Sequence, residues 1–382
     1  MTGPCAWLEG FNSCLEADLL LLQRLVEMES GSSDKEGINR LADYMAREFA
    51  ARGAEAEVHT LGECGHGLRA VWRGRGMGRP VLFLGHLDTV WPPGTVAARP
   101  FVRRDSKAYG PGVYDMKGGL LLCLMVCGAL CGRQLRLDGD VIFLFTPDEE
   151  TGSACGRAWL EAEAAPCRAV LCLEPPLPGG GAKTFRKGVG TFRLRVLGIE
   201  AHAGTEPEKG ANAIVELSRQ VLRLQRMSDA DRGTTVSVGL MRGGSAVNVI
   251  PGCAEAEVDF RFPAVADGKR LARRIAGLQP LDARCRLEIE GGINRPPLER
   301  SPAVVELYSR ARAVAASIGM TLDEGGTGGG SDGSFTAALG VPTLDGLGVE
   351  GGGAHAIHEH VLIPDIPRRA ALLALLVQEL LR

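Results

Sequence analysis

Three short runs of apolar residues, each followed by a turn and a charged residue, constrain the fold of this chain more than any other feature. The runs cover residues 81–84, 141–145 and 169–173, and the residues that follow them are Gly85-His86, Thr146-Pro147-Asp148 and Glu174-Pro175. Continuous apolar runs of this length are typical of strands covered on both faces. Helical patterns at 118–131 and 153–164 lie between them. This alternation predicts an α/β fold with a mostly parallel, mixed sheet flanked by helices.

The middle of the chain follows a different pattern. From Ala254 to Phe262, apolar and charged residues alternate, which is typical of an antiparallel strand with one face in water. Further strands and two helical patterns surround this segment. We therefore expect an α+β domain at residues 186–296, inserted into a first domain that is formed by residues 1–185 and 297–382.

Charge and apolar content exclude several classes of partner. Lys+Arg 43 against Asp+Glu 46 gives a net charge of −3, and aromatic residues make up 5%, so nothing indicates nucleic-acid binding. The longest apolar stretch, residues 118–132, is shorter than the roughly 20 residues that span a bilayer. We expect it to be a buried helix and expect no membrane partner.

The cysteines and the N-terminus indicate a cytoplasmic protein. Eleven Cys are scattered without a CxxC pair, and the first residues lack a basic start followed by an apolar run. The simplest interpretation is reduced, packed thiols, without a disulfide framework.

Polar clusters follow the predicted strands, at the edge where open α/β sheets bind ligands. They contain His86 and Asp88, Asp115, the pair Glu149 and Glu150, Glu174, and a loop with His355, His358 and His360. His86 and Asp88 are two residues apart in an extended segment, so they share a side. A carboxylate in this position can fix the tautomer of a metal-bound imidazole.

Two histidines and three carboxylates can hold two divalent cations that share one carboxylate, and a further acid is left to act as a base. Each cluster also has a plainer interpretation. A single histidine at a strand end is more often structural, a Glu-Glu pair is usually a solvated face, and Asp115 could cap the helix that follows it. The combination in this order favours the metal site.

At this point the chain resembles a known family: the dinuclear zinc amidohydrolases and exopeptidases that include acetylornithine deacetylase, succinyl-diaminopimelate desuccinylase, aminoacylase and carboxypeptidase G. The resemblance runs from about residue 80 to 365. The matching segments are 85–90, 109–119, 146–152, 174–175, 201–204, 248–251, 259–261, 328–332 and 353–360. Within the family, the local sequence is most similar to the carboxypeptidase G, or glutamate carboxypeptidase, type.

The resemblance implies a ligand set for two Zn²⁺ per subunit, with Co²⁺ or Mn²⁺ as substitutes. One ion would be held by His86, Asp115 and Glu174, and the other by Asp115, Glu150 and His355. Asp115 would bridge the ions, and its peptide bond to Met116 is expected to be cis. His355 is chosen because the family places this ligand four residues before a Glu, here Glu359, and His358 remains the alternative.

The resemblance also assigns catalytic roles. Glu149 would take the proton of the bridging water and pass it to the leaving amine, and Asp88 would orient His86. His202 resembles a histidine that polarises the scissile carbonyl, often across a dimer, although it follows Ala201 where a serine is common. The inserted domain would then be a lid and a homodimer interface.

Four further residues are candidates for substrate binding. Asn248 and Arg261 resemble residues that hold the free carboxylate of the substrate, for which an arginine fork is suited. Lys183 and Arg295 lie in segments similar to those that receive a glutamate side chain in carboxypeptidase G. Lys183 and Arg295 could equally be ordinary surface charges, and without the resemblance Arg261 would be interpreted as a solvated strand residue.

The favoured hypothesis is therefore a zinc carboxypeptidase or amidohydrolase that releases a C-terminal amino acid, preferably glutamate, from a peptidyl or N-acyl substrate. An N-acyl amino acid deacylase of the acetylornithine deacetylase type is the alternative. A non-catalytic binding protein is disfavoured because the ligand set and the base are all present. A dinucleotide-dependent oxidoreductase is excluded because no GxGxxG follows a strand.

Overall fold

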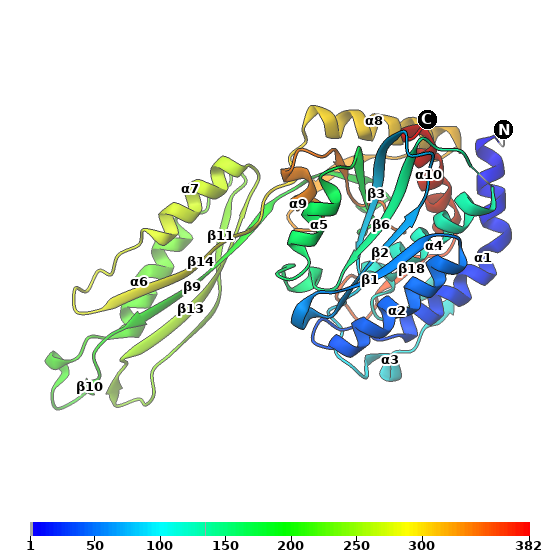
Figure 1. Cartoon of the computed structure of the whole chain (residues 1–382). Helices are drawn as coiled ribbons and strands as arrows, with labels where there is room; N and C mark the ends of the chain where they lie inside the picture. Colours follow the sequence, from blue (N-terminus) through cyan, green and yellow to red (C-terminus); the bar gives the residue numbers. More distant parts are fainter. Residues whose placement is uncertain (1–2, 134) are drawn as a thin grey trace. The chain divides into compact units, whose positions relative to one another are not determined.

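The computed structural model describes residues 3–133 and 135–382 and divides into two compact units (Figure 1). Unit 1 contains the residues up to Phe185, Arg300–Gly326 and Ser331–Arg382, and unit 2 contains Arg186–Glu299 and Thr327–Gly330. Unit 2 begins where the inserted domain was expected, ends three residues beyond Pro296, and also takes in the short segment at Thr327–Gly330.

Unit 1 is built on a six-stranded mixed sheet with the order β1-β2-β6-β3-β7-β16. The strands are β1 (Glu55–Thr60), β2 (His66–Trp72), β3 (Gly78–His86), β6 (Gly139–Thr146), β7 (Ala169–Cys172) and β16 (Thr343–Leu344). The last four in sheet order are mutually parallel, whereas β1 and β2 join antiparallel at one edge. The predicted α/β class with a mostly parallel mixed sheet is confirmed.

Helices cover both faces of this sheet (Figure 1). They are α1 (Pro4–Glu27), α2 (Lys35–Ala51), α4 (Gly118–Gly132), α5 (Arg157–Ala164), α8 (Pro302–Ser317), α9 (Gly333–Ala338) and α10 (Asp365–Leu380). The short α3 (Thr95–Ala98) has no buried residue and belongs to neither core. Within β3, Phe83 packs into the core formed with α1, α2, α4, α8 and α10, while Leu82 and Leu84 pack into the core formed with α5 and α9. Burial on both sides explains why the strand sequences are continuously apolar.

Helix α4 is the apolar stretch noted in the sequence. The segment Val113–Gly132 is long and apolar enough to cross a membrane, but 78% of its apolar window is buried inside the protein. Its residues Leu120, Leu124 and Val126 belong to the main core. The expected buried helix is confirmed.

Small strand pairs position the loops of unit 1. A four-stranded sheet with the order β17-β18-β5-β4 contains β4 (Val102–Arg104), β5 (Lys107–Tyr109), β17 (Gly351–Gly352) and β18 (His360–Leu362). The antiparallel pairing of β18 with β5 brings the loop at 353–359 beside the segment that follows Tyr109. A further pair is formed by β8 (Ala182–Arg186) and β15 (Glu324–Thr327).

Unit 2 has an antiparallel sheet with the order β11-β13-β9-β14. Its strands are β9 (Gly188–Leu197), β11 (Thr235–Gly243), β13 (Cys253–Phe262) and β14 (Arg286–Arg295), and its helices are α6 (Ala213–Gln225) and α7 (Val265–Ala276). In β13, Val258 and Phe260 are buried in the core shared with both helices, while Glu257 is exposed. The alternation that predicted a strand with one wet face is thus accounted for.

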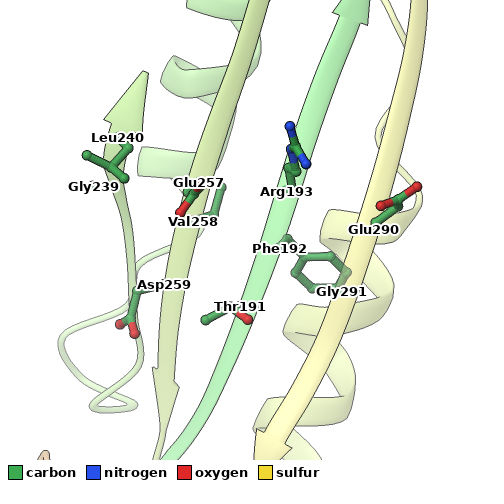
Figure 2. A pocket seen from close by; sticks show the side chains of 10 residues that line it. All are labelled: Thr191, Phe192, Arg193, Gly239, Leu240, Glu257, Val258, Asp259, Glu290 and Gly291. Atoms are coloured by element: carbon green, nitrogen blue, oxygen red, sulfur yellow. The ribbon is translucent and has the colours of Figure 1, made fainter. Parts of the chain in front are cut away.

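The open face of this sheet carries mixed charges. A shallow hollow there is lined by residues that include Arg193, Glu257, Asp259 and Glu290, with Leu240 at its edge (Figure 2). Leu240 is 63% exposed. This face is a solvated surface of the described chain, distinct from the helix-covered core.

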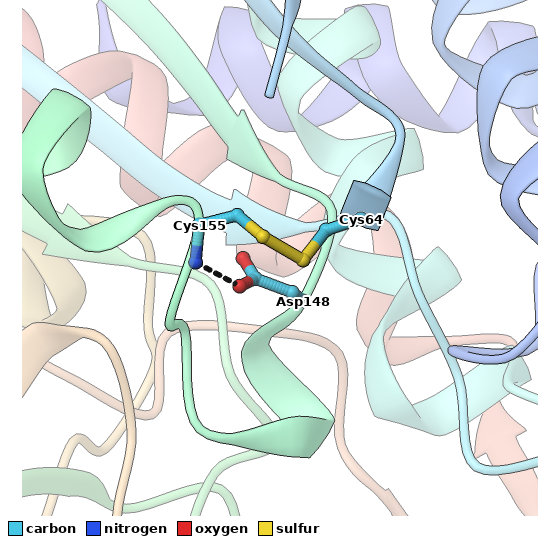
Figure 3. A group of neighbouring side chains, drawn as sticks. All are labelled: Cys64, Asp148 and Cys155. Carbon is cyan, nitrogen blue, oxygen red and sulfur yellow. Dashed lines mark hydrogen bonds between the residues drawn. A yellow bond between two sulfur atoms is a disulfide. The ribbon is translucent and has the colours of Figure 1, made fainter. Parts of the chain in front are cut away.

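The expectation of reduced thiols throughout was wrong for one pair. Cys64 and Cys155 form a disulfide beside Asp148 (Figure 3), and their Cα atoms are 6.3 Å apart. Cys64 lies in the turn η1 (Gly62–Cys64) between β1 and β2, and Cys155 lies shortly after β6. The β2–β6 pairing brings the two segments together. They are 91 residues apart in sequence, so no local spacing indicated the bond.

Candidate metal centre

Histidine and carboxylate side chains from five segments of unit 1 meet at one edge of its sheet. His86 ends β3, Glu149 and Glu150 begin the turn η3 (Glu149–Thr151) after β6, and Glu174 follows β7. Asp115 lies in the short helical segment η2 (Val113–Lys117), and His355 lies in the loop after β17. Parallel strands end at the same edge of a sheet, which explains why the residues after β3, β6 and β7 converge here. The pairing of β18 with β5 brings the segments of His355 and Asp115 beside each other.

Asp115 lies between the two histidines. Its Oδ1 is 3.3 Å from Nε2 of His86, and its Oδ2 is 3.4 Å from Nε2 of His355. His86 Nε2 is also 3.5 Å from Oε1 of Glu174, and His355 Nε2 is 3.3 Å from Oε1 of Glu150. One carboxylate therefore presents a separate oxygen to each half of the cluster, as a bridging ligand does.

Three atoms of this cluster are buried and make no hydrogen bond within the described part of the chain. They are Nε2 of His86, Oδ1 of Asp115 and Oε1 of Glu150. Ligand atoms of His86, Asp115 and Glu150 lie within 4.8 Å of one another, as do those of His86, Glu149 and Glu174. Buried polar atoms are normally satisfied, and this nitrogen and oxygen set suits Zn²⁺ and related divalent ions. The residues present therefore fit a metal centre.

The protonation of the cluster follows from burial and mutual contact. Burial alone would raise the pKa of Asp115, but His355 and His86 hold it well below its usual value. Burial raises the pKa of Glu150 to about 7, and the neighbouring Asp115 adds to this. For His355, the Asp115 carboxylate raises the pKa to about 9. The raised pKa values of Glu150 and His355 favour their protonated forms when no cation is bound.

Asp88 contacts both sides of the site. Its carbonyl oxygen lies 2.9 Å from Nδ1 of His86, and its carboxylate Oδ1 lies 3.3 Å from the same nitrogen. The carboxylate also accepts the backbone N–H groups of Glu149 and Glu150, at 3.1 and 3.2 Å, and the hydroxyl of Ser32 at 2.7 Å. The sequence indicated the first contact but gave no signal for the second.

His355 is the histidine of its loop that contacts the acids. Its backbone has a φ of 61°, a conformation that residues other than glycine rarely adopt. The alternative, His358, is exposed like His355, and its carbonyl oxygen lies 2.9 Å from Nδ1 of His360. The peptide bond between Asp115 and Met116 is cis, which confirms that expectation.

The remaining predicted residues of unit 2 form two separate groups. His202 (β10, Ala201–His202) and Asn248 lie side by side, because Ala203 N–H donates to the Asn248 carbonyl at 2.9 Å and β10 pairs with β12 (Val249–Ile250). Arg261 instead lies near the opposite end of the β13–β9 ladder.

The second group surrounds the short segment Thr327–Gly330. The guanidinium of Arg261 donates to the Asp259 carboxylate at 2.8 Å and to the Gly328 carbonyl at 3.3 Å. A Cβ on Gly330 would lie 3.1 Å from Cδ of Arg295. Arg186, which the sequence did not single out, is buried and donates to the Gly330 carbonyl at 2.7 Å.

Comparison with known proteins identifies the family. The model of peptidase family M20/M25/M40 matches residues 82–379, a span that contains the whole cluster. The chain belongs to this family. The resemblance stated from the sequence is therefore confirmed, and the protein is a hydrolase of the M20 peptidase and amidohydrolase class.

Two curated M20 relatives cover almost the whole chain. Carboxypeptidase G2 of Pseudomonas sp. (strain RS-16) is 32% identical over 368 residues, which are 94% of this chain and 88% of that protein. Succinyl-diaminopimelate desuccinylase of Nitrosococcus oceani is 28% identical over 370 residues, 92% of this chain and 96% of that protein.

Solved structures share the M20 fold. Aminopeptidase PepT of Bacillus cereus matches with a TM-score of 0.77 and 21% identity, over 96% of this chain and 99% of that one. The M20 family metallo-carboxypeptidase Sso-CP2 of Sulfolobus solfataricus matches with a TM-score of 0.74 and 17% identity, over 94% and 98%. At this identity they show the fold alone.

Proposed function

We propose that this M20 protein is a metal-dependent carboxypeptidase or amidohydrolase with two Zn²⁺ per subunit, which releases a C-terminal amino acid, preferably glutamate, from a peptidyl or N-acyl substrate. The observation that carries the proposal is the position of Asp115, with one oxygen towards His86 and the other towards His355. His86, Asp115 and Glu174 would hold one ion, and Asp115, Glu150 and His355 the other. Co²⁺ or Mn²⁺ would substitute.

The residue assigned to proton transfer is Glu149. When bound, two divalent ions would polarise the scissile carbonyl and lower the pKa of a water held between them. Glu149 is buried beside His86 and Glu174, and its backbone is fixed by Asp88. A fixed carboxylate in this position takes the proton from the attacking water and delivers it to the leaving nitrogen.

His202 is the residue proposed to stabilise negative charge on the carbonyl oxygen. Its Nδ1 accepts the backbone N–H groups of Gly204 and Thr205, both at 3.1 Å. A neutral imidazole whose Nδ1 accepts carries its proton on Nε2. Since the ring is exposed, this N–H group is available to donate to an oxyanion.

We propose a homodimer through unit 2, and the separation of His202 and Arg261 supports it. Arg261 pairs with Val189, and Cys253 pairs with Leu197 at the other end of the same ladder. Eight residues at about 3.4 Å each give about 27 Å, and β10 lies beyond that far end (Figure 1). One chain therefore cannot place both residues on one small substrate. If both act on it, they come from different subunits.

Complementation between inactive variants tests the dimer. The variants His202→Ala and Glu149→Gln are each expected to lose activity, and mixed dimers are expected to regain part of it. One site of such a dimer combines an intact Glu149 with an intact His202 from the other subunit. Mixed dimers as inactive as their parents would contradict the shared site.

The preference for glutamate rests on basic residues and on one relative. Lys183 and Arg295 are both buried, so the interpretation as ordinary surface charges is weakened. Arg261, already held by Asp259, is proposed to bind the α-carboxylate together with Asn248, which lies beside His202 and would therefore come from the other subunit. The carboxypeptidase G2 similarity supports a carboxypeptidase. The desuccinylase similarity supports the alternative, an N-acyl amino acid deacylase of the acetylornithine deacetylase type.

A substrate panel with added Zn²⁺, Co²⁺ or Mn²⁺ separates these activities. Faster turnover of folyl- or benzoyl-glutamate than of N-acetyl or N-succinyl amino acids supports the carboxypeptidase, and the reverse order supports the deacylase. Lys183→Ala and Arg295→Ala are expected to raise KM about tenfold for glutamate substrates and to leave neutral ones unchanged. No hydrolysis of any compound with any of the three metals would favour the non-catalytic binding protein.

The proposal keeps the cytoplasmic location that the sequence favours. The Cys64–Cys155 disulfide argues against it, because stable disulfides are typical of oxidising compartments. Fractionation of the source cells, with thiol labelling of each fraction, decides between the cytoplasm and an oxidising compartment.

A further inference from the structure

One buried carboxylate holds the backbone next to the proposed metal ligands. Glu359 is 2% exposed. Its Oε2 accepts Nε1–H of Trp91 and the backbone N–H of Gly112, both at 2.8 Å. Its Oε1 accepts the backbone N–H groups of Tyr114 and Asp115, both at 3.0 Å. A single side chain therefore satisfies four donors.

These donors and Glu359 itself belong to three segments that carry metal ligands. Trp91 lies five residues after His86, in the loop that follows β3. Asp115 is itself one of the donors. Glu359 lies four residues after His355, in the same loop. The carboxylate thus links the backbone segments of His86, Asp115 and His355, although Glu359 is not one of the proposed metal ligands.

The contacts require a carboxylate. Each oxygen of Glu359 accepts two N–H donors, and an ionised carboxylate has only acceptor sites. An amide of the same size would replace one oxygen by an NH₂ group and would place this donor against two N–H groups. Glutamine therefore keeps the shape of the side chain but loses half of its hydrogen bonds.

We propose that Glu359 is a positioning residue that sets the metal affinity of the site formed by Asp115 and His355, without contacting the metal. This inference rests on the proposed dinuclear centre. Partners that orient metal ligands typically change metal affinity by about 10–100-fold when they are removed. Loss of the Glu359 hydrogen bonds frees the backbone of Asp115 and uncouples the His355 loop from it. The ion held by Asp115, Glu150 and His355, called the second ion below, should therefore be bound more weakly, with a smaller effect on the ion held by His86, Asp115 and Glu174.

The test is a Zn²⁺ titration of metal-free protein in competition with a chromophoric chelator, which needs no substrate. The full-length protein is expected to bind two ions, and Glu359→Gln is expected to bind one of them at least about tenfold more weakly. Glu216→Gln is the matched control. Glu216 is 1% exposed in unit 2 and accepts the backbone N–H groups of Leu281 and Asp282, at 2.8 and 3.0 Å.

The outcomes separate a positioning role from a structural one. Weaker binding of one ion in Glu359→Gln, with both affinities kept in Glu216→Gln, supports the inference. Unchanged affinities in Glu359→Gln, or equal losses in both variants, overturn it. If the unsubstituted protein binds fewer than two ions, the dinuclear centre itself is wrong and the inference falls with it.

A milder variant decides the question should Glu359→Gln not fold. Trp91→Phe removes one of the four donors and keeps the carboxylate and the three backbone contacts. A several-fold weaker second ion in this variant supports the positioning role, and affinities equal to those of the unsubstituted protein overturn it.

Discussion

The backbone N–H group of Glu149 donates a hydrogen bond of 3.1 Å to Oδ1 of Asp88. Because the Asp88 carbonyl oxygen also lies 2.9 Å from Nδ1 of His86, the position of the proposed base is tied to that of a proposed ligand. His86 ends β3 and Glu149 lies in η3 after β6, and Asp88 sets their relative placement.

Replacement of Glu149 should remove proton transfer and leave the metal site intact. Glu149→Gln is expected to lower kcat by about 10²–10⁴-fold, with little change in KM or in bound metal. Steady-state kinetics and elemental analysis of the same preparation measure both effects. The exposed Glu306, paired with Arg310 at 2.9 Å, provides the control Glu306→Gln. Turnover by Glu149→Gln equal to that of the control would show that another group is the base.

The two candidate histidine ligands can be separated by their metal content. His355→Ala is expected to lose one bound ion, because His355 lies 3.3 Å from Glu150 and 3.4 Å from Asp115. His358→Ala is expected to keep both ions. The measurement is metal content after dialysis against a weak chelator, and the reverse pattern would make His358 the ligand.

Asp18 in α1 predicts a pH-dependent loss of stability. Burial raises its pKa from 3.8 to about 6, opposed by Arg52, and its Oδ2 makes no hydrogen bond within the described residues. The folded state thus binds the Asp18 proton more tightly than the unfolded state does. The contribution of Asp18 to the free energy of unfolding is therefore fully present below pH 4 and is lost as the pH rises through 6. Asp18→Asn should be more stable than the unsubstituted protein above pH 6, by about 1–2 kcal/mol after allowance for solvent screening.

Urea unfolding of both proteins at pH 4, 5, 6 and 7.5 measures this difference. The gap between the two curves should open between pH 4 and 6 and then stay constant. A gap that is the same at all four pH values would assign the effect to packing instead of to ionisation.

The disulfide should contribute measurably to stability. Cys64 and Cys155 close a long loop, with 91 residues of sequence separation, and such bonds typically contribute about 2–4 kcal/mol by restricting the unfolded chain. The double variant Cys64→Ser/Cys155→Ser is expected to lose that amount in urea unfolding. Reductant should bring the unsubstituted protein to the level of the double variant and should leave the double variant unchanged. Insensitivity of the unsubstituted protein to reductant would show that the bond is absent in solution.

The fold was predictable where a local run of apolar residues indicates a buried strand. The run Val81–Leu84 predicted a strand covered on both faces, and its residues do alternate between two cores. The convergence of His86, Glu150 and Glu174 was predictable because parallel strands end at one edge, whereas Asp115 lies in η2, outside these strands. His355 needed the resemblance to a family, since local sequence does not separate it from His358.

Contacts made across long sequence separations were not predictable. The second role of Asp88, the four hydrogen bonds of Glu359 and the Cys64–Cys155 bond all depend on which loops the tertiary structure brings together. The sequence indicated Glu359 only through its distance of four residues from His355, and not through its hydrogen bonds. The edge strand β1 was not predicted because its residues include many polar side chains.

The packing of α10 against α1 has a consequence for biosynthesis. Residues of α10, such as Leu372 and Leu376, fill the same core as Leu22 and Leu25 near the start of the chain. During translation, unit 1 therefore lacks part of its core until Asp365–Leu380 has left the ribosome. Unit 2 is complete far earlier except for the four residues Thr327–Gly330, once Arg186–Glu299 has been synthesised. A nascent-chain experiment should find protease resistance first in the inserted segment, with the metal-binding edge completed only after release.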